Sequence, residues 1–500
     1  MKQAKCILDK DYIICDIDPR LYGSFIEHMG RAIYSGIYEP GHPMADEQGF
    51  RKDVMELVKG LKVPIVRYPG GNFVSGYNWV DGIGPRENRP RRLELAWSSI
   101  ETNEIGIDEF ADWAKKVNAE VMPAVNLGTG TPKEAGYMLE YCNHPSGTYW
   151  SDLRIKNGHK QPHKFKVWCL GNEMDGSWQI CSLSADEYGR KARETAKIMK
   201  WIDSDVELVA CGSSNTELPS YPEWDRKVLE YVYDYIDYYS LHRYYEQDED
   251  NNVADFLASF FEMESFIKTI IATADYVKAK NRSKKTMYLS FDEWNVWYCK
   301  QVKLEKWQIA PAISEENYSL LDALVVGGML CTLLKNSDRI RIACQAQLVN
   351  TIAPILTQKG GTAIKQTIYY PFQQVSTYGR GELIKPILKC PLFETKKYGE
   401  VPVLQSAAAY DAENGNVNLF VLNCDQNEDI NLSVNLRSFG DAEIIEHVVL
   451  DGADINAINS FEEPYKVIPR EVKVDRKRGN EFVLSLPKLS WNMIRFSIVS

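Results

Sequence analysis

Two acidic residues in this sequence could act as a chemical pair. The segment FKVWCLGNEMDG (165–176) is an apolar run that leads to Glu173, and TMYLSFDEWNVW (286–297) leads in the same way to Glu293. Each run is typical of a buried strand with a carboxyl group at its C-terminal end. Hydrolysis of a glycosidic bond uses two such groups, one that protonates the leaving oxygen and one that attacks or shelters the anomeric carbon. Either glutamate alone could simply cap a helix or face water, so the hypothesis depends on the pair.

The segments around the pair alternate between predicted strands and predicted helices. Helical stripes lie at 50–61 and 107–117, and Thr131 and Ser184 each begin a capping box that opens a helix. The predicted strands cover residues 22–27, 64–72, 120–126, 165–170, 206–211, 236–241, 286–293 and 340–347. This alternation predicts an α/β fold, a (β/α)8 TIM barrel whose strands all point one way. Glu173 and Glu293 would then end the fourth and seventh strands and open onto one face.

After a proline-led helix at 371–378, the hydrophobic period changes from helical to alternating. Apolar residues recur at every second position in 417–421, 430–436 and 482–486. We therefore expect a catalytic barrel at 18–380 and a C-terminal all-β sandwich, jelly-roll-like, at 381–500. A hairpin predicted at 1–17 is expected to join the sandwich.

Polar side chains of several kinds follow the predicted barrel strands. They are Glu27, Arg67, Asn72, Asn126, Asn172, Glu173, His242, Tyr244, Glu293 and Gln347. A sugar presents hydroxyl groups that both donate and accept hydrogen bonds, and carboxylate, amide, guanidinium and phenol groups together match them. Trp97, Trp294 and Trp297 could supply apolar walls for a sugar, although core packing is the commoner use of a tryptophan.

The composition is that of an ordinary globular protein, with 44% hydrophobic and 25% charged residues. The formal net charge of −11 disfavours a nucleic acid or an anionic membrane as partner and suits a neutral polar substrate. The N-terminal MKQAKCILDKDY lacks the continuous apolar stretch of an export signal, and no window reaches the roughly 20 apolar residues of a membrane span. We expect a cytoplasmic protein whose 11 cysteines are reduced thiols.

Other chemistries have weaker support in the sequence. Glu27, His28 and His242 could ligate a metal at strand ends, and His159 and His163 lie four positions apart, but a proline between them interrupts a shared helix face. The 7 histidines include no HExxH pattern, so we expect no metal and no cofactor. A GxSxG elbow and a phosphate-binding GxxxxGKS/T loop are also missing from the sequence.

The strand-end residues fall in segments that resemble the α-L-arabinofuranosidases of glycoside hydrolase family 51. The segments are GSFIEHMG (23–30), VRYPGGNFVSGYNWVDGIGP (66–85), IETNEIGIDEF (100–110), WCLGNEMDG (168–176), SLHRYYE (240–246), LSFDEWNVWY (289–298) and AQLVNTIAPI (346–355). They span the barrel in order, and the resemblance covers the C-terminal sandwich more weakly. It implies an exo-acting enzyme that releases terminal non-reducing α-L-arabinofuranosyl residues, with retention, from arabinan, arabinoxylan or arabino-oligosaccharides.

The resemblance also implies roles for individual residues. Glu173 matches the general acid/base and Glu293 the nucleophile, with His242 supporting Glu293. The residues expected to hold the sugar are Glu27, Arg67, Asn72, Asn172, Tyr244 and Gln347, with Trp97 and Trp297 beside them. The family is often hexameric, so a homo-hexamer is implied. The acidic run after Tyr245, Glu-Gln-Asp-Glu-Asp, departs from expectation and leaves the leaving-group preference open.

Three alternatives stay open at this point. Another retaining barrel glycosidase, an endo-glucanase or a xylanase, could use the same two glutamates. A non-catalytic carbohydrate-binding protein could keep the barrel and bind sugars without turnover. A metal-dependent barrel enzyme would lose its activity on chelation and regain it with a divalent ion.

Overall fold

The computed structural model describes residues 1–299, 305–474 and 477–499. Its centre is a closed barrel of parallel strands that neighbour one another in chain order. The barrel strands are β3 (Gly23–Phe25), β4 (Ile65–Tyr68), β7 (Glu120–Val125), β8 (Val167–Leu170), β9 (Glu207–Ala210), β10 (Tyr238–Tyr245), β11 (Tyr288–Val296) and β12 (Ile340–Ala346). Each overlaps a predicted strand, so the TIM-barrel prediction is confirmed.

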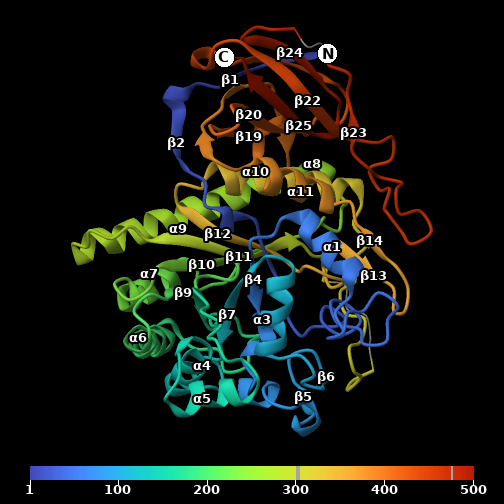
Figure 1. Ribbon diagram of the computed structural model, residues 1–500. Helices are drawn as coiled ribbons and strands as arrows, with labels where there is room; N and C mark the ends of the chain where they lie inside the picture. Colours follow the sequence, from blue (N-terminus) through green and yellow to red (C-terminus); the bar gives the residue numbers. More distant parts are fainter. Residues whose placement is uncertain (300–304, 475–476, 500) are drawn as a thin grey trace.

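Helices follow the barrel strands, and most of them cover the outside of the barrel (Figure 1). They are α1 (Lys52–Leu61), α2 (Gly71–Val74), α3 (Ile107–Lys116), α4 (Pro132–Asn143), α5 (Tyr149–Lys156), α6 (Ala185–Ile202), α7 (Glu223–Val232), α8 (Val253–Leu257), α9 (Ser259–Asn281), α10 (Leu320–Lys335) and α11 (Tyr369–Tyr378). Both predicted capping boxes are present, with Thr131 capping α4 and Ser184 capping α6. These caps satisfy N–H groups that the first helical turn leaves free. Among the described residues, no helix combines the length and apolar character needed to cross a membrane.

An all-β sandwich lies on one side of the barrel (Figure 1). One sheet has the order β2-β15-β19-β20-β25-β22-β23 and the other β16-β1-β21-β24. Their strands are β1 (Lys2–Ile7), β2 (Ile13–Asp16), β15 (Glu382–Ile384), β16 (Ile387–Lys389), β19 (Leu404–Asp411), β20 (Asn416–Asn423), β21 (Ile430–Asn435), β22 (Ala442–Leu450), β23 (Arg470–Glu471), β24 (Glu481–Leu486) and β25 (Ser490–Ile498). Leu432 and Leu484 from one sheet and Leu419 and Ile494 from the other belong to one apolar core. The predicted C-terminal β-domain is therefore present.

The hairpin expected at the N-terminus does not form. β1 pairs with β21 and β16, whereas β2 pairs with β15 in the other sheet. Pairing with distant strands is more stable than a local hairpin, because each N-terminal strand joins a sheet that has an apolar face to bury. The chain leaves the sandwich between β2 and β3 and returns to it between α11 and β15. The domain limits of 18–380 and 381–500 stay a prediction.

The sandwich packs on the barrel through its seven-stranded sheet. Trp491 of β25 lies against Gly327 of α10, where a Cβ atom would come within 2.5 Å of the indole. The Trp491 Nε1–H also donates to Gln374 of α11 at 2.7 Å. A hairpin of β17 (Leu392–Thr395) and β18 (Gly399–Pro402) meets the barrel where the Lys396 N–H donates to Asp255 at 2.7 Å. The β17–β18 hairpin of the C-terminal domain thereby contributes side chains near the ends of the barrel strands.

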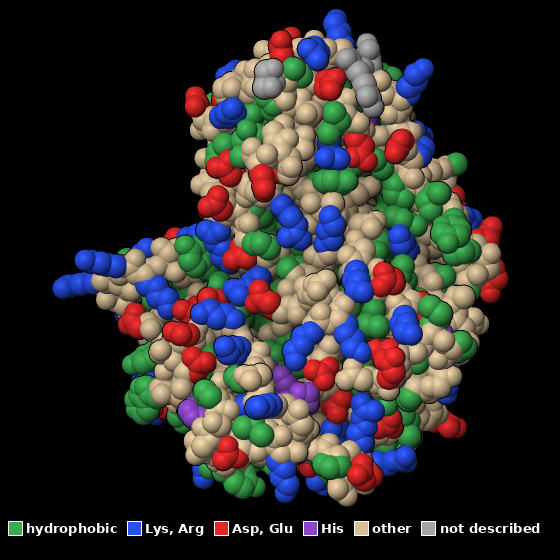
Figure 2. All heavy atoms as spheres, in the orientation of Figure 1, with side chains coloured by type: hydrophobic (Ala, Val, Ile, Leu, Met, Phe, Trp, Pro, Cys, Tyr) green, Lys and Arg blue, Asp and Glu red, His purple; other side chains and the backbone are tan. Residues whose placement is uncertain are grey.

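Shorter strand pairs and mixed surface charges complete the fold. The pairs are β5 (Arg92–Glu94) with β6 (Ser99–Glu101), and β13 (Ile355–Thr357) with β14 (Ala363–Lys365). On the face shown in Figure 2, basic and acidic side chains are interspersed. This face of the described chain therefore does not present the broad basic field that binds nucleic-acid phosphates.

Candidate active site

Glu173 and Glu293 face one another at the C-terminal end of the barrel strands. Glu173 follows β8 in a left-handed backbone conformation with φ of 42°. Glu293 lies on β11, which continues to Val296 instead of ending at the acid. Both residues are buried, with 9% and 4% exposure. One oxygen of each carboxyl group and a ring nitrogen of His242 all lie within 4.8 Å of one another. Two acids far apart in the chain therefore share one pocket.

Arg67, Tyr244 and His242 hold the two carboxyl groups. Arg67 Nη1 donates to Glu293 Oε1 at 2.7 Å, and the Tyr244 hydroxyl donates to Glu293 Oε2 at 2.7 Å. His242 Nδ1 lies 3.0 Å from Glu173 Oε1 and 3.6 Å from Glu293 Oε2. Both oxygens of Glu293 are therefore oriented by donors. His242 contacts Glu173 more closely than Glu293, the residue it was expected to support.

Asp292 lies buried beneath the two glutamates, in contact with Arg67 and His242. Its Oδ2 lies 3.2 Å from Arg67 Nε, and its Oδ1 accepts a hydrogen bond from Ser240 at 2.5 Å. The same Oδ1 is 3.5 Å from His242 Nε2. Burial raises the pKa of Asp292, but the Arg67 and His242 cations outweigh it and hold this pKa below its usual value. Asp292 is thus a fixed negative charge that orients both cations.

The clustered charges also shift His242 and Glu293. Burial lowers the pKa of His242, but the Glu293, Asp292 and Glu173 carboxyl groups reverse this effect and raise the pKa to about 10. Burial raises the pKa of Glu293 above its usual value, with His242 and Arg67 acting in the opposite direction. His242 therefore carries a positive charge at neutral pH. This charge reduces the repulsion between the two carboxyl groups.

We expect the stability cost of His242→Gln to depend on pH. Folding raises the pKa of His242 from 6.5 to about 10. Its contribution to the free energy of unfolding is therefore complete below about pH 6.5 and is lost as the pH rises toward about 10. The gap in melting temperature between wild type and variant should be largest near about pH 6 and shrink toward about pH 10.

Thermal melts of both proteins across this range measure the gap. Comparison with wild type cancels the titrating groups that do not interact with His242. His144→Gln, at a half-buried histidine outside the site, is the matched control. A gap for His242→Gln that does not change with pH would contradict the expectation.

Glu27 is a third carboxyl group in the same cavity. Its Oε1 accepts from the Phe73 N–H at 2.8 Å and from Trp97 Nε1 at 2.7 Å. Its own N–H donates to Gln347 Oε1 at 3.0 Å. Burial raises the pKa of Glu27 well above its usual value, although both accepted hydrogen bonds oppose this. Position 71 requires glycine, because its φ is +67° and a Cβ atom would lie 2.2 Å from Glu27 Oε2.

The site opens into a cavity of about 580 Å³. The predicted residues in its wall are Glu27, Asn72, Trp97, Glu173, Tyr244, Glu293, Trp297 and Gln347. The other three, Arg67, Asn172 and His242, are buried next to these residues, and Arg67 Nη2 donates to Asn172 Oδ1 at 2.6 Å. The second amide atom of this asparagine, Nδ2, has no hydrogen-bond partner among the described residues. The structure thus brings all of these predicted residues together.

Two strand-end residues lie elsewhere, and one important residue was not predicted. Asn126 donates to a loop carbonyl at 3.0 Å and shapes its own loop outside this cavity. Trp294 is fully buried in the core, whereas the adjacent Glu293 faces the pocket. Trp178 was missed, yet its Nε1–H donates to Glu173 Oε2 at 2.5 Å and it lines the cavity. Its closeness to the GNE motif was the only sequence signal.

Glu173, His242 and Glu293 have the spacing of a metal-binding group. The electrostatics of the pocket oppose a metal ion there. Arg67 donates to Glu293 at 2.7 Å and already supplies positive charge to this group. The arrangement therefore favours proton transfer and attack by carboxyl groups.

Facing carboxyl groups at the fourth and seventh strands of a (β/α)8 barrel define the site of a barrel glycoside hydrolase. Residues 57–265 match the α-L-arabinofuranosidase 1 domain, and residues 292–490 match the α-L-arabinofuranosidase C-terminal domain. The chain belongs to the α-L-arabinofuranosidases of glycoside hydrolase family 51.

Similarity to individual proteins extends over the whole chain. The chain is 54% identical to an intracellular exo-α-(1→5)-L-arabinofuranosidase of Acetivibrio thermocellus, over 99% of each chain. It is 53% identical to intracellular exo-α-(1→5)-L-arabinofuranosidase 1 of Bacillus subtilis, again over 99% of each chain. A solved family 51 α-L-arabinofuranosidase from Bifidobacterium longum matches with a TM-score of 0.95 and 42% identity, over 99% of this chain and 100% of that one. These matches confirm the resemblance and support it over an endo-glucanase or a xylanase.

Proposed function

We propose that the protein is an exo-acting α-L-arabinofuranosidase that works by double displacement, with retention of configuration. The observation that carries the proposal is the spacing of Glu173 and Glu293, whose closest ligand oxygens lie within 4.8 Å of each other. Carboxyl groups are about 5–5.5 Å apart in retaining glycosidases and about 6.5–9.5 Å apart in inverting ones. We propose direct attack by one carboxylate, because the two carboxyl groups lie close together and donors already orient both oxygens of Glu293.

The first step forms a covalent intermediate on Glu293. One of its oxygens bonds to the anomeric carbon, the glycosidic C–O bond breaks, and the Glu173 proton passes to the leaving oxygen. Water then bonds to the same carbon and gives a proton to Glu173, and the ester bond to Glu293 breaks. Arg67 and Tyr244, each 2.7 Å from a Glu293 oxygen, orient the nucleophile before substrate arrives.

The remaining polar groups are proposed to bind the hydroxyls of the arabinofuranosyl ring. Glu27, Asn72 and Gln347 line the cavity, and Trp97 and Trp297 supply its apolar walls. In the described structure, the buried Nδ2 of Asn172 and Oε1 of Gln179 have no hydrogen-bond partner. A buried polar group without a partner costs about 1–3 kcal/mol, so a bound hydroxyl that satisfies one would favour the complex.

The names of similar proteins support a substrate and a location. Two are intracellular enzymes named for α-(1→5)-linked arabinofuranosyl groups. We propose that this enzyme likewise acts in the cytoplasm on α-(1→5)-linked arabino-oligosaccharides derived from arabinan. Arabinoxylan fragments are the second candidate substrate. The hexamer implied by the family is a prediction that analytical ultracentrifugation can check.

Aryl glycosides and product stereochemistry test the proposed function. We expect the aryl α-L-arabinofuranoside to be cleaved on the order of 100-fold faster than the β-D-xyloside or β-D-glucoside. Proton NMR during the first turnovers should show the α-anomer of arabinofuranose before it equilibrates. Preferred cleavage of a xyloside or glucoside would overturn the substrate assignment. The β-anomer as first product would overturn double displacement.

Side chains from two loops extend the cavity away from the catalytic pair. Glu246 and Asp248, from the acidic run after β10, line it, as do Lys397 and Tyr398 from the β17–β18 turn. Tyr398 is half-buried and can present its ring to a second sugar. We propose that this end of the cavity binds the part of the substrate that leaves.

We expect Tyr398→Ala to raise KM for an arabino-oligosaccharide by about tenfold and to leave KM for an aryl arabinofuranoside within about twofold. The aryl substrate has no second sugar that could lose a stacking partner. Tyr465→Ala, at a tyrosine that is 75% exposed on the sandwich, is the matched control. Equal changes in KM for both substrates would show that Tyr398 acts through the fold.

A further inference from the structure

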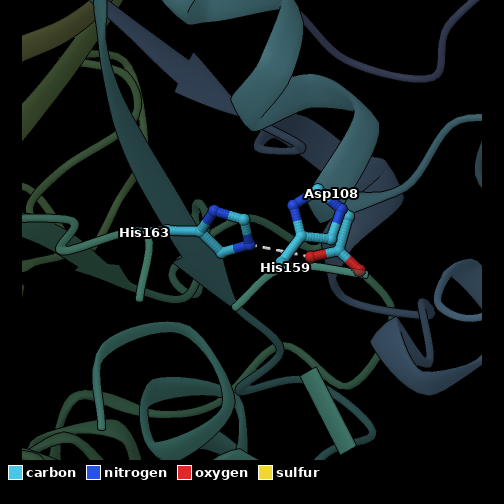
Figure 3. A group of neighbouring side chains, drawn as sticks. All are labelled: Asp108, His159 and His163. Carbon is cyan, nitrogen blue, oxygen red and sulfur yellow. Dashed lines mark hydrogen bonds and ion pairs between the residues drawn. The ribbon is translucent and has the colours of Figure 1, made fainter. Parts of the chain in front are cut away.

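A second cluster of ligand-type side chains lies outside the active site (Figure 3). Asp108 belongs to the first turn of α3, while His159 and His163 belong to the loop between α5 and β8. One possible ligand atom from each of the three residues lies within 4.8 Å of those from the other two. We propose that Asp108, His159 and His163 bind one Zn²⁺ ion, with water as the fourth ligand.

The loop that carries both histidines makes this convergence possible. The two residues lie past the end of α5, so their spacing of four does not describe a helix face. Their ring centroids are 5.1 Å apart, and His163 Nε2 lies 2.7 Å from Asp108 Oδ1. Backbone hydrogen bonds hold both positions, from the His159 N–H to the Arg154 carbonyl at 3.1 Å and from the His163 N–H to the Cys142 carbonyl at 2.7 Å. The ligands are therefore largely in place before an ion arrives.

Neighbouring side chains orient the carboxylate as they do in protein zinc sites. The Tyr141 hydroxyl donates to Asp108 Oδ2 at 2.5 Å, and Asn157 Nδ2 donates to the Tyr141 hydroxyl at 3.1 Å. Asp108 Oδ2 is thereby occupied, and Oδ1 is directed at the histidines. Hydrogen bonds of this kind to a ligating group fix its orientation and raise metal affinity.

The donor set and the burial select the kind of ion. Two imidazole nitrogens and one carboxylate oxygen suit Zn²⁺, whereas Ca²⁺ and Mg²⁺ prefer a shell of oxygen ligands. Asp108 is 3% exposed and the His163 side chain 1%, while His159 is half-buried and leaves a path from solvent. Zn–N and Zn–O bonds are about 2.0–2.2 Å long, so ligand atoms around a tetrahedral ion lie about 3.3–3.5 Å apart. The 2.7 Å contact between His163 Nε2 and Asp108 Oδ1 must therefore open slightly, while His159 approaches. The half-buried His159 is the residue best placed to move.

An ion in this position would join α3 to the segment that enters β8, the strand that precedes Glu173. Zinc would therefore stabilise the folded protein without entering the active site. The cluster differs from the catalytic one in its surroundings, because the Arg67 guanidinium donates to Glu293 at 2.7 Å and places a cation directly against the Glu173, His242 and Glu293 group. This difference makes the proposed zinc site separable from the catalytic group by measurement.

Zinc binding to the full-length, tag-free protein tests the proposal. After treatment with a chelator and dialysis, the protein is titrated with Zn²⁺ against a chromophoric zinc indicator, and its melting temperature is measured with and without one equivalent of zinc. We expect one ion per chain, a higher melting temperature, and unchanged hydrolysis of an aryl glycoside at that stoichiometry. The His159→Ala variant should bind zinc at least about tenfold more weakly and show no rise in melting temperature.

Three controls distinguish zinc binding at this cluster from binding elsewhere and from unfolding of a variant. His144→Ala removes a half-buried histidine of the same region outside the cluster and should bind zinc as the wild type does. His163→Gln provides a second ligand variant, and thermal melts without metal show that each variant is folded. Co²⁺ in place of Zn²⁺ should lack the charge-transfer absorption of a thiolate, which would instead reveal binding at the exposed Cys181 or Cys299. Failure of the wild type to bind zinc, or equal affinity of His159→Ala and wild type, would overturn the proposal.

Discussion

The Glu293→Gln variant is expected to lose on the order of 10⁴-fold or more in kcat on every arabinofuranoside. A neutral amide cannot form the ester with the anomeric carbon, so the first step loses its nucleophile. Good and poor leaving groups should suffer alike, because both reactions need the same attacking carboxylate. Glutamine keeps the shape of the side chain and can still accept from Arg67, which now donates to Glu293 at 2.7 Å. The fold should therefore survive.

Steady-state rates on two aryl arabinofuranosides of different leaving-group pKa measure this effect. Glu264→Gln is the matched control, since this glutamate lies on α9, pairs with Lys335 at 3.0 Å and is outside the active-site cavity. Mass spectrometry of the quenched reaction should find no glycosyl-enzyme in Glu293→Gln. A covalent intermediate in that variant, or a loss in kcat below about 100-fold, would remove Glu293 as the nucleophile.

The Glu173→Ala variant is expected to show a loss that depends on the leaving group. With a poor leaving group, kcat/KM should fall by about 10²–10⁴-fold, because the departing oxygen has lost its proton donor. With a very good leaving group the first step needs little protonation, so the glycosyl-enzyme should form and then accumulate. Hydrolysis of that ester lacks its general base. The result would be a burst of product followed by slow turnover.

Azide provides a direct check on the role of Glu173. This anion needs no general base, so it should restore turnover of the activated substrate and yield a glycosyl azide with retained configuration. Glu194→Ala, at an exposed carboxylate on α6, is the control and should respond to azide as the wild type does. The role of Glu173 as acid/base is excluded if Glu173→Ala cleaves good and poor leaving groups with the same proportional loss.

The barrel and the location of its two acids could be predicted from the sequence because the information is local. Buried parallel strands appear in the sequence as short apolar runs. The capping boxes at Thr131 and Ser184 mark the starts of helices through hydrogen bonds within four residues. The order of strands then follows, since parallel strands joined by helices close in chain order. Glu173 and Glu293 could be assigned to one face of the barrel without coordinates.

Tertiary structure alone decided the contacts that cross between segments. His242 lies nearer Glu173 than Glu293, and Trp178 donates to Glu173, because side-chain directions depend on how loops pack above the barrel. The N-terminal strands enter two different sheets, and His159 meets Asp108, through long-range contacts that leave no periodic trace in the sequence. The strands, the helix caps and the pair of acids could be predicted because their signals lie within a few residues of the chain. Only the folded chain decided which buried charges meet, because that depends on packing between residues remote in sequence.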